Sequence, residues 1–262
     1  MAGPPPELNA PRIFMPDYYE RMRELERASW WNAGMRDVAS MLLGLVTLPA
    51  RGRLLDVGCG SGQTMSWFSS LQPEWRTLGI DVAPEGLAAA RACGLRTVLR
   101  ASALDLPLPT ALVDLVISLD MLQHVPLDGG DVRALAEMAR VLKPGGHLFL
   151  RTNGQSFPRV ADDPTFQFHK YDTEELRSKL RDAGFRVVRL GRVNALLGLA
   201  EIPRELRVRN GEHSYHGLLS EPRAEPRWLA ALKRAWLRLE GRLVRRGASL
   251  PLGRTIVALC QR

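Results

Sequence analysis

The chain has 262 residues, of which 45% are hydrophobic and 24% charged, and its mean hydropathy is −0.13. This composition is typical of a water-soluble globular protein with room for one large α/β domain, and it excludes a disordered or membrane-embedded chain. The net charge of +8 is uneven, because the first 200 residues carry 23 Lys and Arg against 22 Asp and Glu, whereas the remainder carries 13 against 6.

The N-terminal part is expected to be helical. After a proline-rich start, apolar residues recur at helical spacing over residues 17–48, a stretch that includes Tyr18 and the pair Trp30-Trp31. Two explanations of these aromatic residues are open. They pack on the following domain, or they belong to a cover that closes over a bound ligand and excludes water. Under either explanation, we expect residues 1–50 to form an N-terminal helical cover.

From residue 53, short apolar runs alternate with helical patterns. This alternation predicts right-handed βαβ units and a mainly parallel sheet, whose ligands bind at the carboxyl ends of the strands. The loop at 153–171 is long enough to be a lid or a binding loop. The expected strands are 53–57, 75–81, 95–100, 113–119, 147–152 and 185–193, and the expected helices are 63–71, 84–93, 131–142 and 173–183.

Residues 195–247 again show helical spacing, and their last part, 226–247, is amphipathic and basic. Three explanations of this basic helix are open. It docks on the protein's own sheet with a solvated charged face, it attaches to an anionic membrane through Trp228 and Trp236, or it captures an acidic substrate or nucleic acid. The chain then ends in an apolar strand.

The most informative motif is the turn Gly58-x-Gly60-x-Gly62, which follows an apolar strand. Its glycines can adopt positive φ angles and let a ligand approach the backbone. The second gap is one residue shorter than in the dinucleotide motif, which seats a pyrophosphate at a helix N-terminus. Asp56, just before the turn, would repel a pyrophosphate and favour a cation. The motif therefore indicates a zwitterionic ligand without phosphate.

Cysteine usage and the chain start bear on the compartment. Cys59, Cys93 and Cys260 are scattered and odd in number, which suggests neither a disulfide framework nor a zinc site. The first residues lack the basic and apolar regions of a signal peptide, and the longest apolar stretch, 38–50, is too short to span a bilayer. We expect a cytoplasmic protein of a reducing compartment, with peripheral membrane attachment as the alternative.

Several motifs together resemble those of class I S-adenosylmethionine-dependent methyltransferases, most closely the bacterial type-11 group. They are the glycine turn with Asp56, an acidic residue (Asp81) about twenty residues further on, and the segments Asp114-Leu-Val-Ile-Ser and Arg140-Val-Leu-Lys-Pro-Gly-Gly-His-Leu. The resemblance covers residues 53–192.

This resemblance implies a Rossmann-like α/β fold with a seven-stranded, mainly parallel sheet and an antiparallel last strand. The last strand would be 255–260, within a closing segment 250–262, and residues 195–249 would be a helical insertion before it. We thus expect the cover to be followed by one methyltransferase domain, 51–262, in a monomer or homodimer.

The resemblance also implies S-adenosylmethionine as methyl donor and S-adenosylhomocysteine as product. Asp56 would orient the glycine turn or pair with the cofactor amine. Asp81 would accept both ribose hydroxyls, cap the following helix, or do both, and Val82 would pack on the adenine. Where the family often has an acidic residue that reads the adenine amino group, this chain has Ser102, a weaker acceptor. The expected cofactor-binding residues are Asp56, Gly58, Cys59, Gly60, Gly62, Asp81, Val82, Ser102, Ala103, Leu119 and Asp120.

The segment after the fourth strand, 119–124, lies where the family's substrate faces the cofactor. His124 is the expected general base, because a pKa near neutrality lets histidine accept a hydroxyl or amine proton. Alternatively, His124 only shapes the pocket. Metal-assisted quinone O-methyltransferases carry two glutamates before a similar histidine, whereas Asp120 and Gln123 stand here, so we expect no metal site.

The acceptor is expected to be a small molecule or a lipid-linked or glycan molecule, methylated at oxygen or nitrogen. The near-neutral charge of the first 200 residues disfavours a nucleic-acid substrate. Tyr171 has an alternative role as an anchor for the following helix. A non-catalytic S-adenosylmethionine-binding partner or regulator and an RNA methyltransferase are the alternative functions. The residues expected to bind the acceptor are Tyr18, Trp31, Arg36, His169 and Tyr171.

Overall fold

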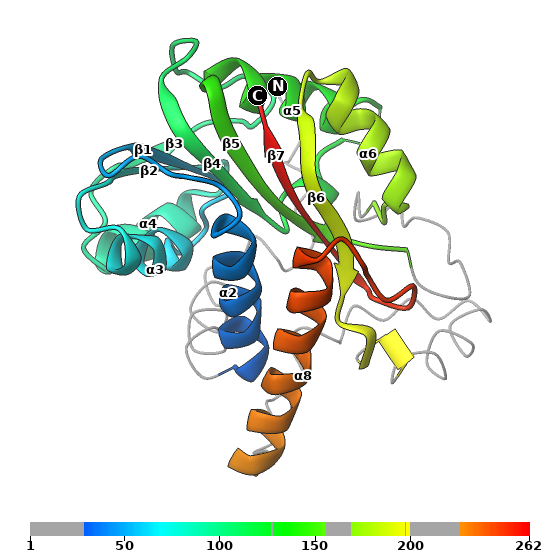
Figure 1. Ribbon diagram of the computed structural model, residues 1–262. Helices are drawn as coiled ribbons and strands as arrows, with labels where there is room; N and C mark the ends of the chain where they lie inside the picture. The colour runs from blue at the N-terminus through cyan, green and yellow to red at the C-terminus, as the bar shows by residue number, and fades with distance from the viewer. Residues whose placement is uncertain (1–28, 127, 156–168, 197, 200–225) are drawn as a thin grey trace, which may run out of the picture.

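The computed structural model describes residues 29–126, 128–155, 169–196, 198–199 and 226–262. Its centre is a seven-stranded sheet in the order β3-β2-β1-β4-β5-β7-β6 (Figure 1). Strands β1 to β5 pair in parallel, and β7 runs antiparallel to both of its neighbours, β5 and β6. The Rossmann-like sheet with a reversed last strand is therefore confirmed.

The strands coincide closely with the apolar runs of the sequence. Most positions along β1, β4 and β7 are buried, as expected for strands covered on both faces. The strands are β1 (Arg53–Val57), β2 (Arg76–Asp81), β3 (Val98–Arg100), β4 (Val113–Leu119), β5 (Leu142–Asn153), β6 (Arg186–Val193) and β7 (Thr255–Gln261).

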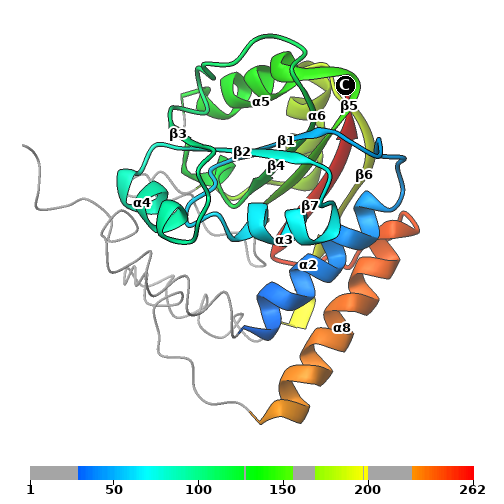
Figure 2. The same ribbon diagram turned by 90° about the vertical axis from the view of Figure 1, so that its left-hand side faces the viewer.

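Helices cover both faces of the sheet. Figure 2 shows α5 and α6 on one face and α2, α3 and α8 on the other. The helices are α2 (Trp30–Leu43), α3 (Gln63–Leu71), α4 (Pro84–Ala92), α5 (Gly130–Val141), α6 (Thr173–Asp182) and α8 (Arg227–Arg245), with a short 3₁₀ turn, η2 (Leu122–His124). In the parts of the chain given above, no helix combines the length and apolar character needed to cross a bilayer.

Two elements differ from the sequence expectation. β3 begins at Val98 rather than at residue 95, because Leu95 packs beside helix α4 and the glycine turn instead of joining the sheet. β5 begins at Leu142 rather than at 147, because Leu142 already pairs with Val113 before a bulge shifts the register. Backbone pairing thus continues past a Pro-Gly-Gly segment that reads as a helix stop.

The two long outer helices, α2 and α8, pack closely together (Figure 2). A Cβ on Gly34 of α2 would lie 2.7 Å from Cδ2 of Leu237, and one on Gly241 of α8 would lie 2.9 Å from Cγ2 of Val38. Arg234 of α8 also donates to Asp37 of α2 at 2.7 Å. Small residues at these two crossing points let the helix backbones approach.

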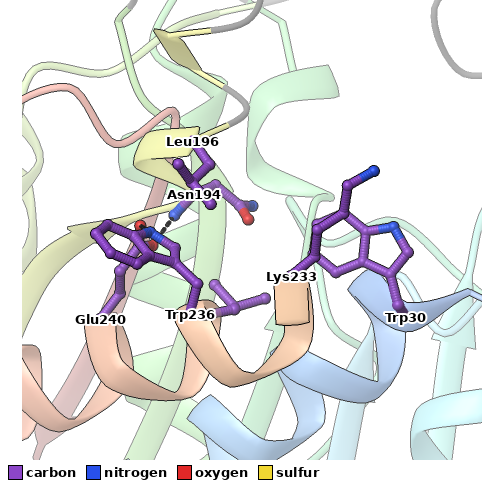
Figure 3. A pocket seen from close by; sticks show the side chains of 7 residues that line it. Trp30, Asn194, Leu196, Lys233, Trp236 and Glu240 are labelled. Atoms are coloured by element: carbon purple, nitrogen blue, oxygen red, sulfur yellow. Dashed lines mark hydrogen bonds between the residues drawn. The ribbon is translucent and has the colours of Figure 1, made fainter. Parts of the chain in front are cut away.

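Helix α8 is also fastened to the end of β6. The buried carboxylate of Glu240 accepts hydrogen bonds from the backbone N–H groups of Asn194, at 2.5 Å, and Ala195, at 3.1 Å, and from the indole of Trp236 (Figure 3). The inner side of α8 is therefore part of the folded domain. This placement supports docking on the protein's own sheet for that side of the basic helix.

Part of the expected cover, including Tyr18, lies outside the described residues, as does most of the loop at 153–171 and the segment 200–225. The division into a cover (1–50) and one domain (51–262) stays a prediction. Within the described part, α2 belongs to the same layer as α8.

Candidate active site

The candidate site lies at the carboxyl ends of β1, β2 and β4, which are neighbours in the sheet. Each of these strands ends in a segment singled out from the sequence: the glycine turn 58–62, Asp81, and the segment 119–124. Because parallel strands end at the same edge, the fold brings the three segments together.

The glycine turn adopts a backbone that only glycine accommodates easily. Gly58, Gly60 and Gly62 have φ angles of +81°, +47° and +77°. The N–H groups of Gly58 and Cys59 both donate to the carbonyl of Ile80, at 2.8 and 3.0 Å, which ties the turn to β2. A Cβ on Gly58 would lie 2.6 Å from Cβ of Met121. The turn therefore runs against the segment that follows β4.

Two residues beside the glycines lie inside the protein. Asp56 is 1% exposed, within β1 beneath the turn, which suits the orienting role expected of it. The thiol of Cys59 is also buried and points at Gly79, whose Cβ, if present, would lie 2.8 Å from its sulfur. Burial raises the pKa of the Cys59 thiol, and the negative charges of Asp56 and Asp81 raise it further. Cys59 is thus a packing residue rather than a nucleophile.

Asp81 joins the glycine turn to helix α4. One carboxylate oxygen accepts from the N–H of Gly60 at 2.8 Å, and the other accepts from the N–H of Ala83 at 2.9 Å. Burial raises the pKa of the Asp81 carboxyl, and these backbone hydrogen bonds oppose that shift. Each oxygen keeps a further lone-pair site, so the carboxylate can still accept two hydroxyl groups of a ligand.

The residues expected around the adenine are partly open to the surface. Val82, directly after β2, is 50% exposed, which leaves its side chain available to a flat ligand. The Ser102 hydroxyl accepts from the N–H of Leu104 at 3.1 Å, and Ala103 is buried beside them. Ser102 is therefore held in a local turn, from which its hydroxyl can still donate or accept one more hydrogen bond.

A stack of three side chains borders the space beyond the glycine turn. Asp120 has a φ angle of +56° and receives a bidentate pair from Arg151, whose terminal nitrogen lies 2.5 Å from the carboxylate. The Arg151 guanidinium lies 4.8 Å from the ring centre of Trp31 in α2. Strained non-glycine backbone of this kind clusters at functional sites. Leu119, just before Asp120, lies partly buried in the core beneath α2.

Arg151 is missing from the expected site residues. It is the charged position at the end of the apolar run of β5, and the parallel register places it opposite Leu119 in β4. A charged residue at the end of a central strand, next to one already singled out, is the signal that would have found it.

His124 lies in η2, directly after this stack. Burial lowers the pKa of its imidazole, although Asp120 acts in the opposite direction. The neutral ring is therefore the dominant form at neutral pH, and a neutral ring nitrogen can accept a proton. Gln123 beside it is structural, since its side-chain oxygen accepts from the N–H of Asn153 at 2.9 Å and from the Thr152 hydroxyl at 3.3 Å.

The structure argues against an acceptor-binding role for Tyr171. Its side chain has no exposed surface, and its hydroxyl donates to Asp131 at 3.1 Å and to the carbonyl of Leu122 at 3.3 Å. The anchoring role is the one these contacts support. His169 packs edge-on against Tyr171, and its Nε2 lies 2.9 Å from Glu175 of α6, so its ring is engaged at the start of that helix.

Replacing Tyr171 with phenylalanine should therefore affect stability rather than catalysis. Loss of the buried hydroxyl leaves Asp131 and Leu122 with one hydrogen bond fewer, and we expect the free energy of unfolding to fall by about 1–2 kcal/mol. Urea unfolding monitored by circular dichroism measures this change. Unchanged stability combined with reduced turnover would contradict it and return the hydroxyl to the acceptor site.

The remaining expected acceptor residue, Arg36, is partly exposed on α2 and forms no ion pair within the described residues. In the same parts of the chain, no group of three or more His, Cys, Asp or Glu side chains is arranged to hold a metal ion. A small hollow between α2 and α8, near Trp30 and Trp236, has a volume of about 10 Å³, which is no larger than a water site (Figure 3).

The sheet order, the reversed β7 and the glycine turn against β2 define a class I methyltransferase fold with a site suited to S-adenosylmethionine. A family model described as a methyltransferase domain matches residues 55–150. A putative methyltransferase of Encephalitozoon cuniculi is 32% identical over an alignment of 155 residues, which covers 52% of this chain and 70% of that protein. A probable S-adenosylmethionine-dependent methyltransferase of Mycobacterium tuberculosis is 32% identical over an alignment of 164 residues, which covers 61% of this chain and 56% of that protein.

Among solved structures, phosphoethanolamine N-methyltransferase 2 of Haemonchus contortus, in complex with S-adenosyl-L-methionine, is similar in fold. The TM-score is 0.63 at 14% identity, with 95% of this chain and 58% of that chain covered. The chain belongs to the S-adenosylmethionine-dependent methyltransferases, and S-adenosylmethionine is its cofactor.

The described residues fit this cofactor. The turn at Gly58 has no room for a side chain, Asp81 presents a carboxylate with free acceptor capacity, and Val82, the next residue, is an exposed apolar side chain. The individual contacts stay predictions.

Proposed function

We propose that the protein methylates a hydroxyl or amine group of a small-molecule or lipid-linked acceptor. The observation that carries this proposal is the stack of Trp31, Arg151 and Asp120 followed by His124, beside the glycine turn. It provides an aromatic wall, a cation held in place by a carboxylate, and a neutral imidazole. These groups suit a small polar acceptor better than a polynucleotide.

The residues have little chemistry to perform beyond alignment and removal of a proton. S-adenosylmethionine, when bound, supplies a methyl group on a positively charged sulfur. The glycine turn and Asp81 hold the donor side, while Trp31 and Arg151 limit the orientations of the acceptor and exclude water. His124 accepts the proton of the acceptor's hydroxyl or ammonium group.

Turnover with a defined acceptor tests the proposal. The protein is incubated with S-adenosylmethionine and fractions of small molecules and lipids, and S-adenosylhomocysteine formation is measured, with isothermal titration calorimetry of the cofactor alongside. Product formation that depends on one fraction supports the proposal. Tight cofactor binding without turnover in any fraction would overturn it in favour of a non-catalytic binding protein.

The His124→Ala variant tests the proton acceptor. We expect kcat to fall by about 100-fold, in the range of general-base catalysis, while the Kd for S-adenosylmethionine stays within a factor of two. His124→Gln, which keeps a polar side chain of similar size, should be equally impaired if proton acceptance matters. If His124→Gln retains full turnover, the ring only shapes the pocket.

The pH dependence follows from the burial of this ring. Because burial lowers the pKa of His124, the neutral form appears at lower pH than for an exposed histidine with a pKa near 6.5. kcat/KM should therefore rise with pH through a midpoint below 6.5 and be level near pH 7. A midpoint well above 6.5 would contradict this assignment.

A further inference from the structure

Helix α8 has two apolar sides, and only one of them packs on other parts of the chain that the structure describes. Its inner side, with Leu237, Gly241 and Val244, is buried against α2 and β6. Its outer side carries large apolar residues that face away from the sheet, with Trp228 69% exposed and Leu232 61% exposed. The outer face of α8 is defined here by the exposed side chains of Trp228, Leu232, Ala235, Trp236 and Leu239.

An open groove of about 600 Å³ runs along the outer face and is lined almost entirely by apolar side chains. Its lining residues are Leu196, Leu229, Leu232, Lys233, Ala235, Trp236 and Leu239. Contiguous exposed apolar surface of this kind marks an interaction site rather than ordinary surface.

Positive charge accompanies this apolar face. Helix α8 contains six Lys and Arg residues and one acidic residue, Glu240, which is buried. Arg238, Arg242 and Arg245 recur at steps of three or four residues and so follow one edge of the outer face. Arg242 and Arg245 form no ion pair within the described residues, whereas Arg234 and Arg238 are both paired with Asp37, at 2.7 and 3.8 Å.

These features match the headgroup region of an anionic membrane. A helix with tryptophan and leucine on one face and arginines along its edge lies in the plane of the interface, with the apolar side chains at the headgroup–acyl boundary and the cations at lipid phosphates. A nucleic-acid surface would use the arginines but leave exposed leucines without a partner.

We propose that the outer face of α8 binds the surface of an anionic membrane. The N-terminal ends of α8 and α2 project from the same end of the sheet (Figures 1 and 2). Trp31, near the start of α2, contacts Arg151 of the candidate site. Membrane attachment through α8 thus places the acceptor side of the site near the lipid surface, which favours a lipid-borne acceptor; this last step rests on the proposed function.

Vesicle sedimentation of the full chain tests the attachment without any acceptor. We expect the protein to sediment with vesicles of phosphatidylglycerol mixed with phosphatidylcholine, and to stay in solution with phosphatidylcholine alone. Leu232→Glu should weaken binding by at least about tenfold, and Arg242→Ala by roughly fivefold. Leu71→Glu is the matched control, because Leu71 is 50% exposed on α3, away from this face, and its replacement should leave binding unchanged.

Several outcomes would overturn the proposal. They are absence of sedimentation with the anionic vesicles, equal loss in Leu232→Glu and Leu71→Glu, or a dimer in sedimentation velocity that Leu232→Glu alone dissociates, which would make a second copy the occupant. Arg242→Ala keeps the test valid if Leu232→Glu does not fold. Turnover with a water-soluble acceptor is measured separately, so failure of membrane binding is distinguishable from failure of the proposed reaction.

Discussion

The Asp81→Ala variant should lose affinity for S-adenosylmethionine by at least about 100-fold. The two hydrogen bonds expected between its carboxylate and the ribose hydroxyls are charge-assisted, and each such bond is worth about 1.5–3 kcal/mol. The carboxylate holds the N–H of Gly60 at 2.8 Å and that of Ala83 at 2.9 Å. Its removal therefore releases the glycine turn from α4 and also takes away the acceptor expected for the ribose hydroxyls. Both effects lower affinity for the cofactor.

Isothermal titration calorimetry with S-adenosylhomocysteine measures this loss without turnover. Glu85→Ala is the matched control, since Glu85 is an acidic residue in the first turn of α4, the helix that follows Asp81, and has no role assigned in the site. We expect its Kd to be nearly unchanged. If the two variants bind equally well, Asp81 does not carry cofactor recognition.

The same carboxyl predicts how binding responds to acid. Burial raises the pKa of Asp81 above the ordinary value of 3.8. A protonated carboxyl accepts the two backbone N–H groups less well, so cofactor affinity should fall as the pH decreases. This fall should begin at a higher pH than it would if the aspartate were exposed. The decrease should be absent in the Asp81→Ala variant.

The fold could be predicted in detail because the information is local. Apolar runs between helical patterns gave most strand positions within a few residues, and the antiparallel β7 followed from the family resemblance. The differences arose where tertiary packing decides. Leu95 packs against the glycine turn rather than extending β3, and Leu142 pairs with Val113 although Pro-Gly-Gly follows it.

The candidate site divides in the same manner. Residues at strand ends, such as Asp81 and Asp120, are fixed by the parallel sheet and could be placed from the sequence. Arg151 and the burial of Tyr171 depend on contacts between segments far apart in the chain, which single-sequence patterns do not encode. An aromatic residue after a long loop looks the same in sequence whether it faces a substrate or the core.

The basic helix shows why one pattern supported several explanations. The sequence of α8 is amphipathic, but its period does not say which apolar side packs on the protein. The glycines at positions 34 and 241 decide this, because they bring α2 and α8 together on the side of Leu237. Trp228 and Leu232 are then left outside.

Gly58→Ala should impair cofactor binding and turnover together. The new Cβ would lie 2.6 Å from Cβ and Cγ of Met121, which are close to the backbone and cannot rotate away as the end of a long side chain could. The φ angle of +81° adds about 1 kcal/mol of strain for a non-glycine residue. The turn and the segment carrying Asp120 and His124 must therefore move apart, so we expect a loss of at least about tenfold in both cofactor affinity and kcat.

The Gly94→Ala variant separates the strain of a positive φ angle from the steric clash with Met121. Gly94 has a similar φ angle, +86°, but a Cβ there would have no atom of the described residues within 4 Å. This variant should lose about 1 kcal/mol of unfolding free energy and keep wild-type cofactor affinity. If Gly58→Ala behaves in the same way, backbone strain alone accounts for its effect, and the contact between the turn and Met121 has no part in positioning the cofactor against His124.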